Sequence, residues 1–327
     1  MTYVPTAPAA IAHADTALTR ATEGLHNDVA PAHVEVASWH FDNLEVQLEP
    51  AHRTFWAFMR PTGKPSFTRE LLRDIAEMQH GVRRLFADRA NEGEKPVNYY
   101  VLGSRTPGIF NLGGDLSHFA ERIRAQDRSS LRRYGQVCVD AVYNNSVAFD
   151  TPVVTIALVQ GDALGGGFEC ALAFDVIVAE RSAKFGLPEI LFNLFPGMGA
   201  YSFLSRRIGP VKAEQMIMSG RLYTAEELHE MGIVDVLAED GMGEEAVHDY
   251  IAKNSRKHNA HRAVFQARRR VNPVTLDELR DVVDIWVEAA LNLTEMDIKK
   301  MLRLTAAQER RMASNTPASA PFAMAAE

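Results

Sequence analysis

The sequence contains little cysteine, no long apolar run and no excess of basic residues. Its two cysteines, Cys138 and Cys170, lack the spacing of metal ligands, which indicates small buried thiols in a reducing compartment. No apolar stretch approaches the roughly 20 residues needed to span a bilayer, and residues 1–33 lack the basic and apolar regions of a signal peptide. A formal net charge of −7 argues against nucleic acid as the main partner. We expect a cytoplasmic protein with no membrane insertion and no nucleic-acid partner.

Motifs of several enzyme classes are also missing. His229-Glu230 is not followed by the second histidine of the zinc motif H-E-x-x-H. The sequence has no G-x-S-x-G motif and no phosphate-loop lysine motif either. We therefore expect no metal site and no redox cofactor. Cys170 lies beside Glu169, but a structural thiol explains it better than a nucleophile does.

The composition that remains, 46% hydrophobic and 24% charged over 327 residues, is that of a soluble globular protein. Residues 1–33 are rich in Ala, Thr and Pro without periodicity, which predicts a disordered extension. Residues 313–327 are predicted to be a flexible tail. Between these ends we expect a core that carries the active site at 34–240, followed by a helical region at 241–312.

Hydrophobic periodicity within the core predicts an α/β fold. Strand-type runs occupy residues 34–61, and Ser66 is a candidate cap for a helix with one buried face. A further strand is expected at 98–102, and the order strand, strand, helix then recurs. In the C-terminal region, apolar residues at helical spacing predict a large buried face. They are Leu276, Leu279, Val283, Trp286, Ala290, Leu293 and Met301.

Residues 151–199 are the most informative stretch. A buried β-branched run leads into the glycine-rich turn 161–167, which opens a short helix, and a later loop carries Glu189. Three consecutive glycines let the backbone approach a ligand, and a helix N-terminus offers unpaired N–H groups to a developing negative charge. Glu169 lies in the first turn of that helix. Two carboxyl groups beside such donors could move protons next to a carbonyl, although a glycine-rich turn alone also fits close packing.

The same stretch resembles the crotonase (enoyl-CoA hydratase/isomerase) superfamily. The resemblance rests on GDALGGGFECALAFDVIVAERSAKFGLPEI, then PGMG, then GRLYTAEELHEMGIVDVL, and it is dense over residues 97–237. It implies a crotonase-like spiral of ββα repeats over residues 34–304, with C-terminal helices that build a trimer or hexamer. It also implies that Glu169 and Glu189 are the catalytic pair. The oxyanion-hole N–H groups of the family map onto Leu112 and Gly166.

Further substrate-binding residues follow from the same resemblance, together with the need for an apolar acyl pocket. They are Gly113, Gly114, Gly165, Gly167, Phe168, Leu187, Leu191 and Met198, with Leu293 and Met296 as further candidates. Each of the apolar candidates, taken singly, fits core packing better than pocket lining.

Within the superfamily, the N-terminal extension, Leu112-Gly113-Gly114-Asp115, Phe168 and residues 191–197 resemble the diffusible-signal-factor synthases. That resemblance implies dehydration of a 3-hydroxyacyl carrier-protein thioester to the cis-2-enoyl form, then thioester cleavage to release a fatty acid signal. The alternative is an enoyl-CoA hydratase of fatty-acid β-oxidation. The substrate is a fatty acyl thioester in both cases, and an acyl carrier protein and a sensor kinase are candidate partners of a signal synthase.

Two arginine clusters remain open to two interpretations. The first is Arg122, Arg124, Arg128, Arg132 and Arg133. It fits a solvated helix face paired with Glu121 and Asp127, or a dock for an acidic carrier protein or coenzyme A. The second, Arg268-Arg269-Arg270, is interpreted as a solvated helix face.

Overall fold

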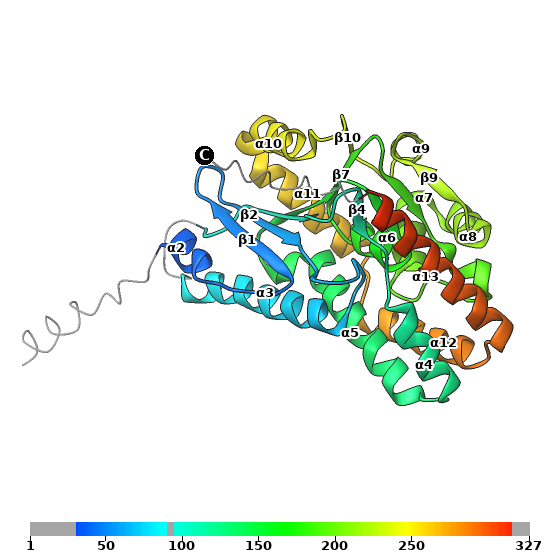
Figure 1. The fold of residues 1–327 in the computed structure, drawn as a ribbon. Helices are drawn as coiled ribbons and strands as arrows, with labels where there is room; N and C mark the ends of the chain where they lie inside the picture. The colour runs from blue at the N-terminus through cyan, green and yellow to red at the C-terminus, as the bar shows by residue number, and fades with distance from the viewer. Residues whose placement is uncertain (1–30, 90–94, 316–327) are drawn as a thin grey trace, which may run out of the picture. The chain divides into compact units, whose positions relative to one another are not determined.

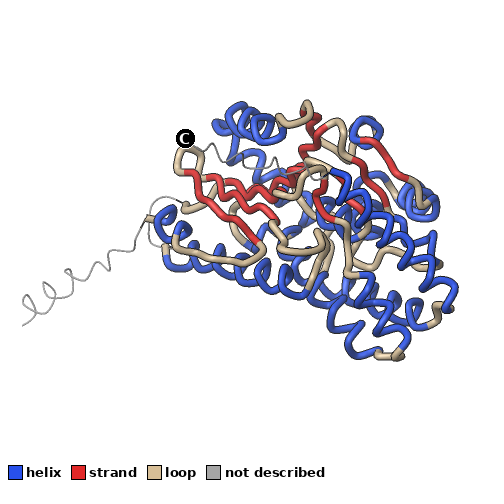
Figure 2. The backbone as a smooth tube through the Cα atoms, viewed as in Figure 1, coloured by secondary structure: helices blue, strands red, loops and turns tan. Residues whose placement is uncertain are grey.

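The computed structural model describes residues 31–89 and 95–315, which form a sheet layer between helices (Figures 1 and 2). The large sheet has six strands in the order β1-β2-β3-β5-β7-β10. These strands are β1 (Leu44–Glu49), β2 (Thr54–Met59), β3 (Tyr99–Ser104), β5 (Val154–Val159), β7 (Val176–Glu180) and β10 (Val236–Ala238). β1 and β2 pair antiparallel, and the remaining neighbours pair in parallel.

A second sheet of four strands has the order β4-β6-β8-β9. Its strands are β4 (Ile109–Asn111), β6 (Asp162–Leu164), β8 (Lys184–Gly186) and β9 (Leu222–Thr224). Each of β4, β6 and β8 directly follows a strand of the large sheet and is followed by helical structure. The predicted spiral of ββα repeats is therefore confirmed, and the repeats run β3-β4, β5-β6 and β7-β8.

The helices that follow these strands and cover the sheets complete the fold. The helices and 3₁₀ turns are α2 (Ala32–Ala37), α3 (Arg69–Asp88), α4 (Leu116–Arg124), α5 (Arg128–Ser146), η1 (Ala148–Asp150), α6 (Gly166–Leu172), η2 (Pro188–Phe192), α7 (Ala200–Ile208), α8 (Pro210–Ser219), α9 (Ala225–Glu230), α10 (Gly243–Asn254), η3 (Ser255–Lys257), α11 (His258–Val271), α12 (Leu276–Leu291) and α13 (Glu295–Asn315). The predicted C-terminal helical region is confirmed by α10 to α13. Among the described residues, no helix is both long and apolar enough to cross a bilayer.

Strands β2, β3, β5 and β7 of the large sheet are buried on both faces, which explains why they are mostly apolar in sequence. In β2 the side chains of Phe55, Ala57 and Met59 join the core cluster that includes α3, α5 and α6. Trp56 and Phe58 point to the opposite face and join a second cluster with residues of α10. Because successive residues of a strand face opposite sides, one strand supplies both cores. The sheet is thus a rigid support for the loops at its strand ends.

The structure corrects three local predictions. Residues 32–37 form α2, where strand-type runs were predicted, and Val36 is buried against the core. The cap of α3 is Thr68, whose hydroxyl accepts a hydrogen bond from the Leu71 N–H at 3.2 Å, rather than Ser66. The predicted flexible tail starts too early, because α13 continues to residue 315. The rest of that tail and most of the predicted disordered extension lie outside the described residues.

Candidate active site

Three loops that are far apart in the sequence meet at one edge of the second sheet. They follow β4, β6 and β8, which pair in parallel, so that their carboxyl ends lie side by side. The loops carry residues 112–114, 165–167 and 187–189, which are the segments that the sequence singled out. The parallel register therefore assembles the candidate site, as it does in other open α/β sheets where ligands bind beyond the carboxyl ends of strands.

A cavity of about 250 Å³ opens at this point, and its lining is mostly apolar. Besides the strand-end loops, it is walled by residues of α4, α5, η2, α12 and α13. The lining residues are Leu112, Gly114, Leu116, Phe119, Tyr134, Gly135, Cys138, Leu164, Gly165, Gly166, Glu169, Pro188, Glu189, Leu191, Phe192, Leu194, Gly197, Met198, Gly220, Leu222, Val283, Trp286 and Leu304. Both predicted catalytic glutamates line this one cavity.

Glu169 is held by the backbone of the loop before α7. The residue is 1% exposed, and its Oε1 accepts hydrogen bonds from the N–H groups of Met198 at 2.7 Å and Ala200 at 2.9 Å. Burial raises the pKa of the Glu169 carboxyl to about 7, while the backbone donors oppose that rise. Because these N–H groups favour the ionised form, Glu169 is the member of the pair better suited to hold a negative charge.

Glu189 has a different environment. Its Oε2 is buried and has no hydrogen-bond partner among the described residues. Burial, followed by the charge of Glu169, raises the pKa of Glu189 to about 8. The order of the two pKa values follows from the partners, since only Glu169 accepts two backbone hydrogen bonds. At neutral pH the pair therefore tends to keep one proton, and that proton resides mainly on Glu189.

Of the two N–H groups predicted for the oxyanion hole, one is already paired in the structure. The Leu112 N–H donates to the Pro65 carbonyl at 2.8 Å. Gly114, two residues later, lines the cavity, and its N–H has no hydrogen-bond acceptor among the described residues. Gly166 also lines the cavity, and as the first residue of α6 it has no intrahelical acceptor. Among these cavity-lining residues, Gly114 and Gly166 are thus the ones whose N–H groups have no acceptor among the described residues.

Close contacts explain why two residues of the triplet 165–167 are glycine, which the sequence alone indicated only in outline. Gly165 has a φ of +51°, and a Cβ at that position would lie 2.5 Å from Glu189 Oε1. A Cβ at Gly167 would lie 2.0 Å from the Asn111 carbonyl oxygen on β4. Gly165 therefore makes room for a carboxylate, and Gly167 lets α6 pack directly on the end of β4.

The other predicted substrate-binding residues divide into two groups. Gly114, Gly165, Leu191 and Met198 line the cavity, and Leu191 is half exposed. The remaining candidates are not among the lining residues: Gly113, Gly167, Phe168, Leu187, Leu293 and Met296. Phe168 is fully buried and packs edge-on against Phe185, whereas Met296 is 67% exposed. Phe168 points away from the cavity because successive residues of a helix face different directions, and only Glu169 projects into it.

Sequence reasoning missed the helical walls of the cavity. Phe119 and Tyr134 come from α4 and α5, and Val283, Trp286 and Leu304 come from α12 and α13. The helical spacing of Val283 and Trp286 was a signal of burial, but it did not indicate which surface they would cover. Tyr134 is fixed by its hydroxyl, which donates to the Phe67 carbonyl and accepts from the Asp115 N–H.

The first arginine cluster is largely paired within the chain. Arg122 contacts Glu121 and Asp127, as predicted for the solvated helix face. Arg124, Arg128 and Arg132 instead reach carboxylates of α12 and α13, with Arg124 donating to Glu295 at 2.5 Å. These pairs tie α4 and α5 to the helices that wall the cavity. Their charge is therefore less available to an acidic partner than the sequence suggested.

Comparison with known proteins gives one family. The sequence profile described as enoyl-CoA hydratase/isomerase matches residues 58–305. Methylglutaconyl-CoA hydratase, mitochondrial, of Rattus norvegicus is 34% identical over 188 residues, which cover 57% of this chain and 55% of that protein. 2,3-Dehydroadipyl-CoA hydratase of Escherichia coli strain K12 is 36% identical over 171 residues, or 51% of this chain and 63% of that protein. The chain thus spans about half to two thirds of the length of these relatives.

Solved structures agree on the fold. DspI of Pseudomonas aeruginosa superposes with a TM-score of 0.58 and 26% identity, covering 72% of this chain and 92% of DspI. An enoyl-CoA hydratase from Bacillus halodurans gives a TM-score of 0.63 at 22% identity, covering 80% of this chain and 100% of that chain. At this identity, the likeness to the Bacillus halodurans structure concerns the fold alone.

Proposed function

The chain belongs to the enoyl-CoA hydratase/isomerase family, and we propose that its two glutamates transfer protons at C2 and at the oxygen on C3 of a fatty acyl thioester. The observation that carries this proposal is the convergence of Glu169, Glu189 and two N–H donors on one apolar cavity. An enolate oxygen formed from the thioester carbonyl would be held by the N–H groups of Gly114 and Gly166. No metal or redox group takes part in this scheme.

The unequal environments of the two carboxyls support the following roles in the hydration direction. Ionised Glu169 takes a proton from water as its oxygen bonds to C3, and protonated Glu189 delivers a proton to C2. Dehydration is the reverse: Glu189 removes the C2 proton, the C3–O bond breaks, and Glu169 protonates the departing hydroxyl. Each direction leaves one proton on the pair, which is the protonation state expected between the two pKa values, about 7 for Glu169 and about 8 for Glu189.

The substrate we propose is a 3-hydroxyacyl carrier-protein thioester, from which the enzyme forms a cis-2-enoyl thioester and then a free cis-2-enoic acid, a diffusible signal factor. In the second step, water attacks the thioester carbonyl, the C–S bond breaks and the thiol leaves. Support comes from the sequence resemblance at residues 112–115 and 191–197, and from the structural likeness to DspI. The alternative is a β-oxidation enoyl-CoA hydratase, which the names of the curated relatives favour.

One experiment separates the two versions. Purified protein is incubated with 3-hydroxyacyl thioesters on an acyl carrier protein and on coenzyme A, and the products are identified by mass spectrometry. Free cis-2-enoic acid from the carrier-protein substrate supports the signal synthase. Reversible hydration of a 2-enoyl-CoA without release of acid supports the hydratase, and inertness toward all the thioesters contradicts both.

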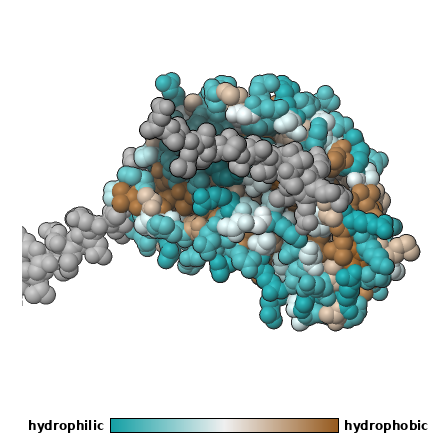
Figure 3. All heavy atoms as spheres, viewed as in Figure 1, coloured by the Kyte–Doolittle hydropathy of each residue, from teal (hydrophilic) through white to brown (hydrophobic). Residues whose placement is uncertain are grey.

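A homotrimer or hexamer belongs to the same proposal. Large apolar side chains are exposed on the C-terminal helices, with Val264, Val271 and Ile285 at 64%, 84% and 60%. Figure 3 shows hydrophobic patches on an otherwise largely hydrophilic face. Patches of this kind typically mark protein contacts. Light scattering coupled to size-exclusion chromatography measures the mass, and a monomer of 36.3 kDa would contradict the proposal.

A further inference from the structure

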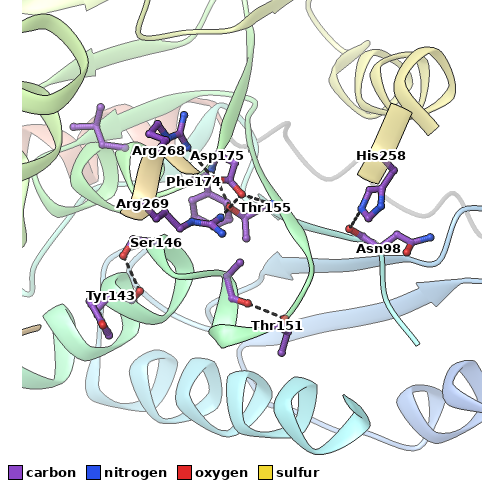
Figure 4. Close-up of polar contacts among 12 residues, drawn as sticks. Asn98, Tyr143, Ser146, Thr151, Thr155, Phe174, Asp175, His258, Arg268 and Arg269 are labelled. Carbon is purple, nitrogen blue, oxygen red and sulfur yellow. Dashed lines mark hydrogen bonds and ion pairs between the residues drawn. The ribbon is translucent and has the colours of Figure 1, made fainter. Parts of the chain in front are cut away.

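A second cavity, of about 290 Å³, lies apart from the two catalytic glutamates. It is bounded by the end of α5, the residues after α6, the helix α7 and the connection between α11 and α12. Its polar lining includes Arg206, Arg207, Arg268 and Arg269, together with Tyr143 and Ser146. Figure 4 shows several of these side chains. The second arginine cluster is therefore not simply a solvated helix face, because two of its three members line a cavity.

The four guanidinium groups differ in the groups to which they donate hydrogen bonds. Arg268 and Arg269 both donate to the buried carboxylate of Asp175, at 2.9 and 2.5 Å (Figure 4). Arg206 makes a two-pronged contact with Glu278, at 2.9 and 2.8 Å. Arg207 donates instead to backbone carbonyls, the shortest contact being 2.6 Å to Phe174.

The cavity region carries an excess of positive charge. Burial lowers the pKa of Arg207, and the charge of Asp235 opposes that shift. Four guanidinium groups thus share three nearby carboxylates, those of Asp175, Asp235 and Glu278. In addition, the Nε atoms of Arg206 and Arg269 are buried without a hydrogen-bond partner among the described residues. One negative charge and its acceptor oxygens would complete this arrangement.

The rest of the lining is apolar. Leu172, Phe174 and Phe203 are almost fully buried and face the same space as Val147 and Val274. Inorganic phosphate carries close to two negative charges and no hydrocarbon, so it suits neither this wall nor a single excess positive charge that lies beside carboxylates. A carboxylate with a small hydrocarbon body matches both.

We infer that this cavity is a binding site for a small amphipathic monocarboxylate, whose carboxylate meets the arginines while its hydrocarbon body lies against Phe174 and Phe203. The inference does not rest on the proposed function, because none of the catalytic residues lines this cavity. The helix α6 lies between the two cavities in the chain: it carries Glu169 in its first turn and ends at Leu172 in this wall.

The test uses the full-length protein as purified and sodium octanoate as the probe, with binding followed by calorimetry. Two variants alter the site: R268Q removes a half-exposed guanidinium while Arg269 still pairs with Asp175, and S146L fills part of the cavity. The matched control is R270Q, on the same helix, because Arg270 is exposed and does not line the cavity. Octan-1-ol and inorganic phosphate are the comparison ligands.

We expect octanoate to bind the wild-type protein and R270Q equally, and R268Q and S146L to weaken binding at this site at least about tenfold or to remove one binding event. Equal octanoate binding by all three variants would overturn the inference, because any remaining binding would then occur in the catalytic cavity. Octan-1-ol binding as tightly as octanoate, or phosphate displacing octanoate, would overturn it as well. If R268Q does not fold, S146L alone decides.

Discussion

At the scale of single residues, the two buried glutamates are the features most open to test. Replacing either by glutamine keeps the shape and removes the titratable carboxyl group. We predict that E169Q and E189Q each lower kcat for hydration or dehydration by about 10²–10⁴-fold, the range typical of a lost general acid or base. Steady-state kinetics on an acyl thioester measures the loss, and circular dichroism checks the fold. Near-normal kcat in both folded variants would contradict the proposed mechanism.

The pH dependence follows from the raised pKa values. Hydration needs Glu169 ionised and Glu189 protonated, so activity should fall when the pair gains a second proton below about pH 7. It should fall again when the pair loses its proton above about pH 8. A bell-shaped profile of kcat/KM, narrow and centred between the two values, is the expected result. A profile that stays flat from pH 5 to 9 would show that the two carboxyls do not act as this pair.

Burial of the Glu189 carboxyl also lowers the stability of the folded protein in alkaline solution, where the carboxyl has to ionise. A carboxyl whose folded-state pKa lies above its unfolded value stabilises the fold at low pH. That contribution is lost as the pH rises through the folded-state value, here about 8. E189Q should therefore melt at least about 2 °C above the wild type at pH 9, and this gain should shrink toward pH 5. Scanning calorimetry of both proteins at the two pH values checks this sign, and a lower Tm for E189Q at pH 9 would contradict it.

At the scale of elements, the packing of α12 on α5 defines one wall of the cavity. A Cβ at Gly135 would lie 2.7 Å from Val283 Cγ1, so these helices approach closely because residue 135 is glycine. We predict that G135A destabilises the protein by about 1–3 kcal/mol, the usual cost of overpacking. The double variant G135A/V283A should recover part of this loss, because the colliding methyl group is gone. Urea unfolding of the four proteins completes the cycle, and strict additivity would mean that the two residues do not collide.

The C-terminal helices also contribute to the wall of the candidate active site. Gly197 in the loop before α7 packs on Trp286 of α12, and a Cβ there would lie 2.6 Å from the indole. Trp286 in turn contacts Phe119 of α4 edge-on, with ring centroids 5.0 Å apart. The aromatic contact links the strand-end loops to the outer helices. The cavity is therefore made of elements from both of the regions that the sequence separated at residue 240.

At the scale of the whole molecule, this continuity argues that residues 34–240 are not independent. One core cluster runs from Val36 to Met301, and Val247 and Ile251 of α10 cover the opposite face of the sheet. We predict that a chain of residues 31–240 does not unfold cooperatively, because both faces would lose apolar cover worth about 25 cal/mol per Å². Urea titration followed by circular dichroism and tryptophan fluorescence tests this. A single sharp transition in both signals would instead establish 31–240 as a domain.

The sequence by itself determined the class of fold and drew attention to two carboxyls. Glu169 and Glu189 stood out because carboxyls among apolar neighbours are costly, and the resemblance to the crotonase family implied their role. Local hydrophobic periodicity predicted an α/β fold, and the same resemblance implied the ββα repeats. Both signals lie within short segments, so no long-range contact is needed to recognise them. The same holds for the helical spacing around Val283 and Trp286.

Only the tertiary structure decided which groups are available and which are already paired. The Leu112 N–H is already paired because Pro65, 47 positions earlier, brings its carbonyl within 2.8 Å of it, whereas the Gly114 N–H has no acceptor among the described residues. Arg268 and Arg269 pair with Asp175 for the same kind of reason. A hydrogen bond between distant segments depends on their register and packing, to within a fraction of an ångström, whereas sequence patterns record only which groups occur and at what local spacing.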